Sequence, residues 1–117
     1  MDPRSHRGTV GEDAAAAWYA DRGFRVIARN WRCPAGELDL VLLRGSLLVI
    51  CEVKARRGDA FGGGFAAVGW EKQRRLRRLT ELFLERRPAL YAAVRFDVAS
   101  VAISGRGASV EIFEDAF

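Results

Sequence analysis

Short apolar runs separated by turn signals fill the middle of the chain. Leucine, valine and isoleucine dominate residues 38–43 and 47–53, with an Arg-Gly-Ser segment at 44–46 between them. Each run is too short for a stable helix, and glycine supplies the positive φ that a tight turn needs. The pattern therefore predicts a β-hairpin over residues 36–54, GELDLVLLRGSLLVICEVK.

The length of the turn decides which hairpin residues share a face. If residues 45–46 form a two-residue turn, Asp39 faces Glu52 and Glu37 faces Lys54, because directly opposed residue numbers keep one sum. A three-residue turn is the alternative, and it would shift the pairing by one and move Glu52 to the opposite face. In the two-residue register the opposite face is wholly apolar and is expected to be core: Leu38, Leu40, Leu42, Val49, Cys51 and Val53.

Helical periodicity predicts one helix on each side of the hairpin. The first is expected from Thr9 to Arg22, ended by Gly23 and preceded by a mobile tail over residues 1–7. The second is expected from Trp70 to Arg87, with one apolar face and one basic face. The core stripe of the first helix is predicted to be Val10, Ala14, Ala17 and Trp18.

Three further strands are expected, over residues 24–31, 94–103 and 110–113. Short connections make the first three strands an antiparallel meander, and a right-handed crossover through the second helix places the fourth parallel to the third. The predicted fold is α/β: a mixed five-stranded sheet in the order 1-2-3-4-5, flanked by helices. A chain of 117 residues fits a single domain, 1–117.

Composition narrows the compartment and the class of partner. A net charge of +4 favours a polyanionic partner such as nucleic acid. The N-terminus lacks the apolar core of a signal peptide and no run is long enough to cross a bilayer, so a cytoplasmic location without membrane contact is expected. Cys33 and Cys51 form no CxxC pair and are expected to stay reduced, and His6, the single histidine, argues against a zinc site.

The opposed carboxylates of Asp39 and Glu52 are the candidate chemistry. Carboxylates held that close repel each other unless a cation lies between them, and Mg²⁺, or Mn²⁺, suits oxygen ligands. Lys54 lies on the same face, where its ammonium can reach a metal-bound water or a phosphate. Of the 19 basic residues 17 are Arg, and Lys54 and Lys72 are the two exceptions. A compact ammonium and a planar guanidinium are not interchangeable near a metal-bound water, although chance also explains two lysines.

Two basic segments are candidate contacts for a nucleic-acid backbone. Residues 55–65 are basic and then glycine-rich, and we expect a loop that brings arginines to phosphates, or else a plain connector. The basic face of the second helix exceeds what solubility requires, so phosphate contact and a merely solvated face both remain open. The candidate binding residues are Arg56, Arg57, Lys72, Arg74, Arg75 and Arg78.

The order of these residues resembles a known superfamily. Asp39, then Glu52-Val53-Lys54 on the next strand, with Glu12 on a preceding helix, is similar to the PD-(D/E)xK nucleases in their Holliday-junction-resolvase-like branch. More closely, the chain resembles the uncharacterised YraN-like family. The matching residues are Gly8, Gly11, Glu12, Ala15, Gly23, Asn30, residues 36–40 and 52–54, Arg56, Lys72, Gln73, and residues 95–97 and 115–117.

The resemblance implies a restriction-endonuclease-like αβββαβ core. It also implies metal ligands at Asp39 and Glu52, an accessory acid at Glu12 and a catalytic lysine at Lys54. Taken alone, Glu12 is explained by the helix dipole, which favours an acid in the first turn. Fold-level likeness cannot by itself supply a reaction.

The expected function is therefore that of a Mg²⁺-dependent endonuclease, in which a metal-activated water hydrolyses phosphodiester bonds of nucleic acid, with branched DNA as a candidate substrate. A homodimer would suit an enzyme that cuts junctions. The alternatives are a nucleic-acid-binding module that keeps the nuclease fold without turnover, and an interaction protein whose hairpin charges are only a solvated sheet face.

Overall fold

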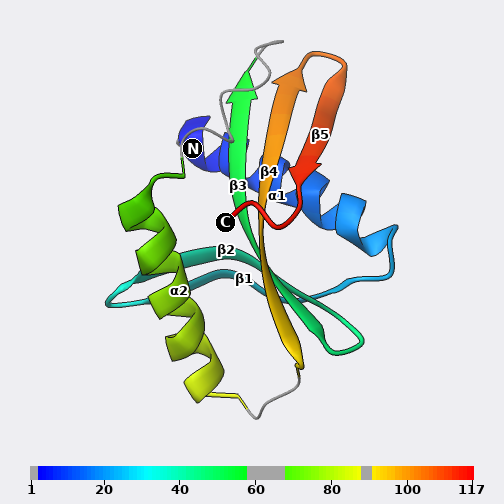
Figure 1. The fold of residues 1–117 in the computed structure, drawn as a ribbon. Helices are drawn as coiled ribbons and strands as arrows, with labels where there is room; N and C mark the ends of the chain where they lie inside the picture. The colour runs from blue at the N-terminus through cyan, green and yellow to red at the C-terminus, as the bar shows by residue number, and fades with distance from the viewer. Residues whose placement is uncertain (1–2, 58–67, 88–90) are drawn as a thin grey trace.

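A five-stranded sheet lies between two helices in the computed structural model, which describes residues 3–57, 68–87 and 91–117 and the side chains of these residues from position 9 onward (Figure 1). The elements, in chain order, are α1 (Pro3–Ala20), β1 (Arg25–Cys33), β2 (Gly36–Arg44), β3 (Leu47–Arg57), α2 (Trp70–Glu85), β4 (Ala93–Ser104) and β5 (Gly107–Phe113).

The predicted topology is confirmed. The strands lie in the order β1-β2-β3-β4-β5, and every neighbouring pair is antiparallel except β3 and β4, which run parallel. The parallel pair follows from the crossover through α2, as expected for a strand, helix and strand in one sheet. The result is an α/β fold with a mixed sheet and the predicted αβββαβ order of elements.

The hairpin has the predicted two-residue turn. Arg44 pairs with Leu47 and Leu40 pairs with Cys51, and Gly45 has a φ of 59°, which glycine adopts without a Cβ clash. The last β2–β3 pair is Leu40 with Cys51. Beyond it β1 and β2 bend away from β3, which continues alongside β4 (Figure 1). We call this point of separation the fork of the sheet.

The fork overturns three details of the predicted register. Asp39 and Glu52 lie just beyond the last β2–β3 pair and are not directly opposed in the ladder. Glu37 does not face Lys54; it pairs with Arg32 on β1, with Arg32 Nε 2.6 Å from Glu37 Oε2. Leu38 also lies beyond the last pair, and it packs in the core beneath α2 rather than with Leu40. The constant-sum rule fails here because it holds only while two strands stay paired.

Both faces of the sheet are buried, each by one helix. The α1 side gathers Leu40, Leu42, Val49 and Cys51, as predicted, while the α2 side gathers Val41, Leu43, Leu48 and Ile50. A strand that is buried on both faces reads as a continuous apolar run rather than an alternating one, and this is the pattern of residues 40–43 and 48–51.

The predicted core stripe of α1 was wrong by about one residue. Gly11, Ala15 and Tyr19 are buried, whereas Ala17 is exposed. A Cβ added at Gly11 would lie 2.8 Å from the Cβ of Ala55, so the helix approaches β3 closely where it has no side chain. Tyr19 is buried because its hydroxyl donates a hydrogen bond to Asp97. The apolar pattern showed neither reason, because glycine has no side chain and tyrosine carries a polar hydroxyl.

Two element boundaries also differ from the prediction. Helix α1 begins at Pro3 rather than Thr9, so residues 3–7 lie in its first turns instead of in the expected tail. Strand β3 continues to Arg57, which places Arg56 and Arg57 on a strand rather than in a loop; the rest of that predicted loop, residues 58–65, lies outside the described residues. No helix among the described residues is long and apolar enough to cross a membrane.

Candidate active site

A pocket of about 240 Å³ lies at the fork of the sheet, beneath the first turns of α2. Strands β2 and β3 supply its acids, because their separation beyond Leu40 and Cys51 leaves room for the side chains of Asp39 and Glu52. The lining residues are Gly36, Glu37, Asp39, Glu52, Lys72, Arg75, Leu76 and Leu79. Asp39 and Glu52 therefore line one cavity without being a paired position of the ladder.

Asp39 is held by the backbone of the neighbouring strand. The N–H of Val53 donates a hydrogen bond to Asp39 Oδ2 at 2.8 Å. This side-chain contact replaces the backbone pairing between β2 and β3, which ends at the fork. Burial, followed by the negative charge of Glu52, raises the pKa of Asp39 to about 7, although the hydrogen bond from Val53 opposes the shift. At neutral pH this carboxyl group is thus poised between its two protonation states.

Glu52 forms an ion pair with Lys72, which was expected on the solvent-facing basic side of the second helix. Lys72 Nζ lies 2.6 Å from Glu52 Oε1, and the two side chains are only 29% and 12% exposed. The sequence had put Lys72 on the outer basic face of the second helix, but in the structure it turns inward to the pocket. Burial opposes the charge of Lys72, yet the hydrogen bond and charge of Glu52 raise its pKa above the usual value.

Lys54 lies next to the same group. Burial, followed by the nearby ammonium of Lys72, lowers the pKa of Lys54, while the charges of Glu52 and Asp39 act in the opposite direction. Both lysines of the chain thus meet at the carboxylates. Their rarity among 17 arginines was the sequence signal that could have found Lys72, had it been applied to both lysines and not only to Lys54.

Glu12 lies at the edge of this group. Asn30 Nδ2 donates a hydrogen bond to Glu12 Oε1 at 2.8 Å, and Arg29 Nη2 lies 3.5 Å from the same oxygen. The charge of Glu12 adds to the raised pKa of Asp39, after the larger effects of burial and Glu52. Within residues 9–57, 68–87 and 91–117, no three acidic, thiol or imidazole side chains converge closely enough to hold a metal ion. Glu12 as an accessory acid stays a prediction.

The chemistry of the pocket nevertheless fits a hard divalent cation. Two carboxylates offer oxygen donors in a half-buried cavity, and Mg²⁺ is commonly held by one or two carboxylates, with waters and substrate phosphates completing its coordination. Asp39 and Glu52 are the residues that would hold such an ion. Burial and then the negative charge of Glu52 raise the pKa of Asp39, and a cation bound beside it would favour the ionised carboxylate.

The six predicted nucleic-acid contacts divide into three groups. Lys72 and Arg75 line the pocket itself. Arg74 and Arg78 are exposed on α2, where Arg78 is 3.2 Å from Glu81. Arg56 and Arg57 lie at the end of β3, the former half-buried and the latter exposed. Basic side chains that could contact a phosphate therefore extend from the pocket to the exposed side of α2.

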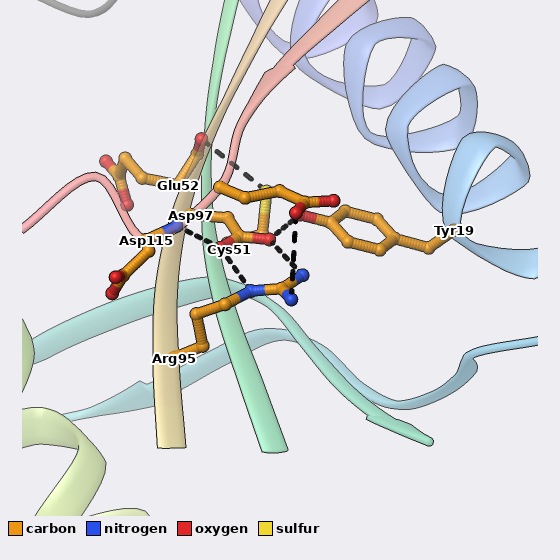
Figure 2. Close-up of polar contacts among 7 residues, drawn as sticks. Tyr19, Cys51, Glu52, Arg95, Asp97 and Asp115 are labelled. Atoms are coloured by element: carbon orange, nitrogen blue, oxygen red, sulfur yellow. Dashed lines mark hydrogen bonds and ion pairs between the residues drawn. The ribbon is translucent and has the colours of Figure 1, made fainter. Parts of the chain in front are cut away.

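A buried polar cluster supports the other face of β3 and β4 (Figure 2). Asp97 is fully buried and accepts hydrogen bonds from the Tyr19 hydroxyl at 2.6 Å, from Arg95 Nε and Nη2 at 2.9 Å each, and from the Asp115 N–H at 3.0 Å. Arg95 and Asp97 form a salt bridge on β4, and Tyr19 and Asp115 bring partners to it from distant parts of the sequence. Four hydrogen bonds satisfy the carboxylate, so this cluster is structural.

Figure 2 also shows how neighbouring residues of β3 serve the two sides of the sheet. The side chain of Cys51 lies beside Tyr19 and Asp97, whereas that of Glu52 points to the other side. Burial raises the pKa of the Cys51 thiol and keeps it protonated. The polar cluster thus anchors α1 and β4 directly behind the strand that presents Glu52.

Comparison with known proteins agrees with the predicted likeness to an uncharacterised family. The relatives include UPF0102 proteins of Streptomyces griseus subsp. griseus, 48% identical over 94% of this chain and 93% of the relative, and of Mycolicibacterium vanbaalenii, 46% identical over 90% and 87%. A UPF0102 protein of Moorella thermoacetica is 42% identical over 97% of each chain. The sequence model of uncharacterised protein family UPF0102 matches residues 11–101. The chain therefore belongs to the family UPF0102.

Proposed function

We propose that this protein is a metal-dependent nuclease that hydrolyses phosphodiester bonds in nucleic acid, with branched DNA as one candidate substrate, in the cytoplasm. The observation that carries the proposal is the meeting of Asp39, Glu52 and Lys72 in one pocket, with Lys54 close enough for its charge to interact with theirs. A solvated sheet face would spread its polar residues along the strands, whereas here the rest of the face is apolar and covered by α2.

Each residue of the pocket has a role in this reaction. Asp39 and Glu52 would hold Mg²⁺ or Mn²⁺, which when bound supplies an activated water and neutralises charge on the phosphoryl oxygens. Lys54 would orient the attacking water or stabilise charge that develops on the phosphate. Arg75 would hold a phosphate at the pocket, while Arg56, Arg57, Arg74 and Arg78 would contact the backbone on either side.

One observation favours a second candidate, a nucleic-acid-binding module without turnover. Lys72 already pairs with Glu52, so the acidic pair has a counter-ion without a metal. Such a module would use the basic surface and would have no use for the carboxylates. The two candidates differ in what a carboxylate substitution does, which makes them separable by experiment.

Cleavage of labelled linear, flapped and four-way-junction DNA, and of RNA, tests the proposal with Mg²⁺, Mn²⁺ or EDTA. We expect the parent to cleave in the presence of metal, Asp39→Asn to be inactive, and Arg106→Gln, an exposed control in the turn between β4 and β5, to retain activity. Metal-independent cleavage, or equal cleavage by Asp39→Asn, would contradict the proposal.

Binding to the same substrates separates the binding module from the nuclease. In EDTA, Asp39→Asn should bind at least as tightly as the parent, because it removes a charge that repels phosphate. Mg²⁺ should then tighten binding by the parent more than by the variant, since the variant lacks one of the two carboxylates that would hold the ion. A module that binds nucleic acid elsewhere would show neither difference.

A further inference from the structure

The contact between Lys72 and Glu52 assigns the lysine a task distinct from that of Lys54. Lys72 projects from the first turns of α2, which is fixed on the sheet by the buried residues Leu76 and Leu79. Its ammonium lies 2.6 Å from a carboxylate oxygen that is also a candidate metal ligand. The same oxygen cannot be fully available to both cations, so the lysine and a divalent ion compete for it.

Resting on the proposed function, we infer that Lys72 is an internal counter-ion that occupies Glu52 in the metal-free protein and transfers to a substrate phosphate when a divalent cation binds. With all four side chains ionised, two carboxylates and two ammonium groups balance. A bound divalent cation adds two positive charges, so the site then attracts anionic phosphates and the displaced ammonium can pair with one of them. Metal and nucleic acid should therefore bind cooperatively through Lys72.

The choice of lysine suits an exchange of partners. An ammonium is a compact charge on a flexible stem, whereas a guanidinium makes planar, bidentate contacts that are harder to exchange. Arg75, about one helical turn further along α2, lines the same pocket and would bind the phosphate together with Lys72. The arrangement keeps the acidic pair neutral until both the metal and the substrate are present.

Mn²⁺ binding without nucleic acid tests the competition, measured by calorimetry and by electron paramagnetic resonance of free Mn²⁺. Lys72→Gln should bind Mn²⁺ about three- to tenfold more tightly than the parent, because the ion no longer displaces a half-buried ion pair. Arg74→Gln removes the same charge from the exposed side of α2 and should stay within about twofold of the parent. Lys72→Arg, which keeps the charge, should not gain affinity.

A second measurement tests the transfer to phosphate. Ca²⁺ or Mn²⁺ should tighten binding of a labelled four-way junction by the parent. For Lys72→Gln, the change in log Kd that the metal causes should be at most about half of the change seen for the parent. Thermal unfolding in EDTA checks folding: Lys72→Gln should melt at a lower temperature than Arg74→Gln, since Glu52 and Asp39 lose their counter-ion.

The outcomes separate the inference from the proposed function. If the parent binds Mn²⁺ and Lys72→Gln binds it no more tightly than Arg74→Gln, the inference is overturned and the metal-dependent nuclease stands. If neither the parent nor any variant binds a divalent cation, both are overturned.

Discussion

Lys54 and Lys72 show that the neighbours of a charged side chain determine its pKa at this site. Both are surrounded by arginines in the sequence, yet both lie against carboxylates in the structure. Lys72 has its pKa raised by an ion pair, whereas Lys54 has its pKa lowered by burial and by Lys72. Two ammonium groups of the same residue type are thus set to different tasks by their immediate neighbours.

Replacing Lys54 with arginine separates charge from shape. Lys54→Arg should leave the melting temperature and nucleic-acid affinity nearly unchanged, because the positive charge is kept. Turnover should fall about tenfold or more, since a planar guanidinium cannot approach a metal-bound water as an ammonium does. Single-turnover kinetics with saturating protein measure this. Turnover equal to that of the parent would show that Lys54 is a generic cation.

The carboxyl group of Asp39 makes stability depend on pH in an unusual direction. Its pKa is about 7 in the folded protein and near 3.8 when unfolded, so the folded state binds more protons between these values. The stability contribution of this group is therefore present at low pH and is lost as pH rises from about 4 to 7. The direction is opposite to that of a carboxylate stabilised by a salt bridge.

Asp39→Asn should remove this dependence. In EDTA, the free energy of unfolding of the parent should decrease relative to that of the variant by about 1–2 kcal/mol between pH 5 and pH 8. Urea unfolding of both proteins across this range measures the difference, and Asp13→Asn, an exposed carboxylate on α1, serves as the control. A difference that is constant with pH would mean that Asp39 titrates normally.

At the scale of elements, helix α1 packs closely on β3 because Gly11 has no side chain. Gly11 meets Ala55 of β3 so closely that an added Cβ would lie 2.8 Å from the Ala55 Cβ. Glu12 follows immediately, so this contact also fixes how far Glu12 lies from Asp39 and Glu52. The position of Glu12 relative to the pocket is thus set by a packing distance.

Gly11→Ala should lower stability even though alanine is the better helix former. The gain in helix propensity is at most about 1 kcal/mol, whereas forcing the helix away from β3 costs about 1–3 kcal/mol. Chemical denaturation measures the net loss. Ala55→Gly in the same chain should restore much of it by removing the opposing Cβ, and an absence of rescue would show that the loss has another origin.

The sequence predicted the elements well because their signals are local. The glycine at position 45 set the hairpin turn, and the strand–helix–strand order set the parallel pairing of β3 and β4. The fork was not predictable, because it depends on how the sheet bends between two helices. The inward turn of Lys72 and the burial of Tyr19 likewise depend on partners distant in sequence, Glu52 and Asp97.

At the scale of the whole molecule, exposed arginines extend the positive charge of the pocket along α2. Arg74 is exposed with no acid paired to it among the described contacts, whereas Arg78 lies beside Glu81. The two arginines should therefore differ in how strongly they hold a phosphate, since Arg78 must give up an existing partner.

Salt dependence of binding reveals this difference. Arg74→Gln should reduce the slope of log affinity against log salt by about 0.7–0.9, the value for one phosphate contact, and Arg78→Gln should reduce it less. Arg106→Gln, in the turn between β4 and β5, should leave the slope unchanged. Fluorescence anisotropy with labelled DNA across a range of salt concentrations measures all three. Equal slopes for every variant would place the nucleic acid away from α2.

Both lysines of the chain lie near the same carboxylates, so reagents that modify amines can label this site selectively. Its 17 arginines do not react with mild amine-directed reagents, so reductive ¹³C-methylation would label Lys54, Lys72 and the α-amino group and no other site. Dimethylated lysines keep their charge and give sharp NMR signals that respond to nearby ions. Two resonances would then report on the whole pocket, with each change assigned by the matching lysine-to-arginine variant.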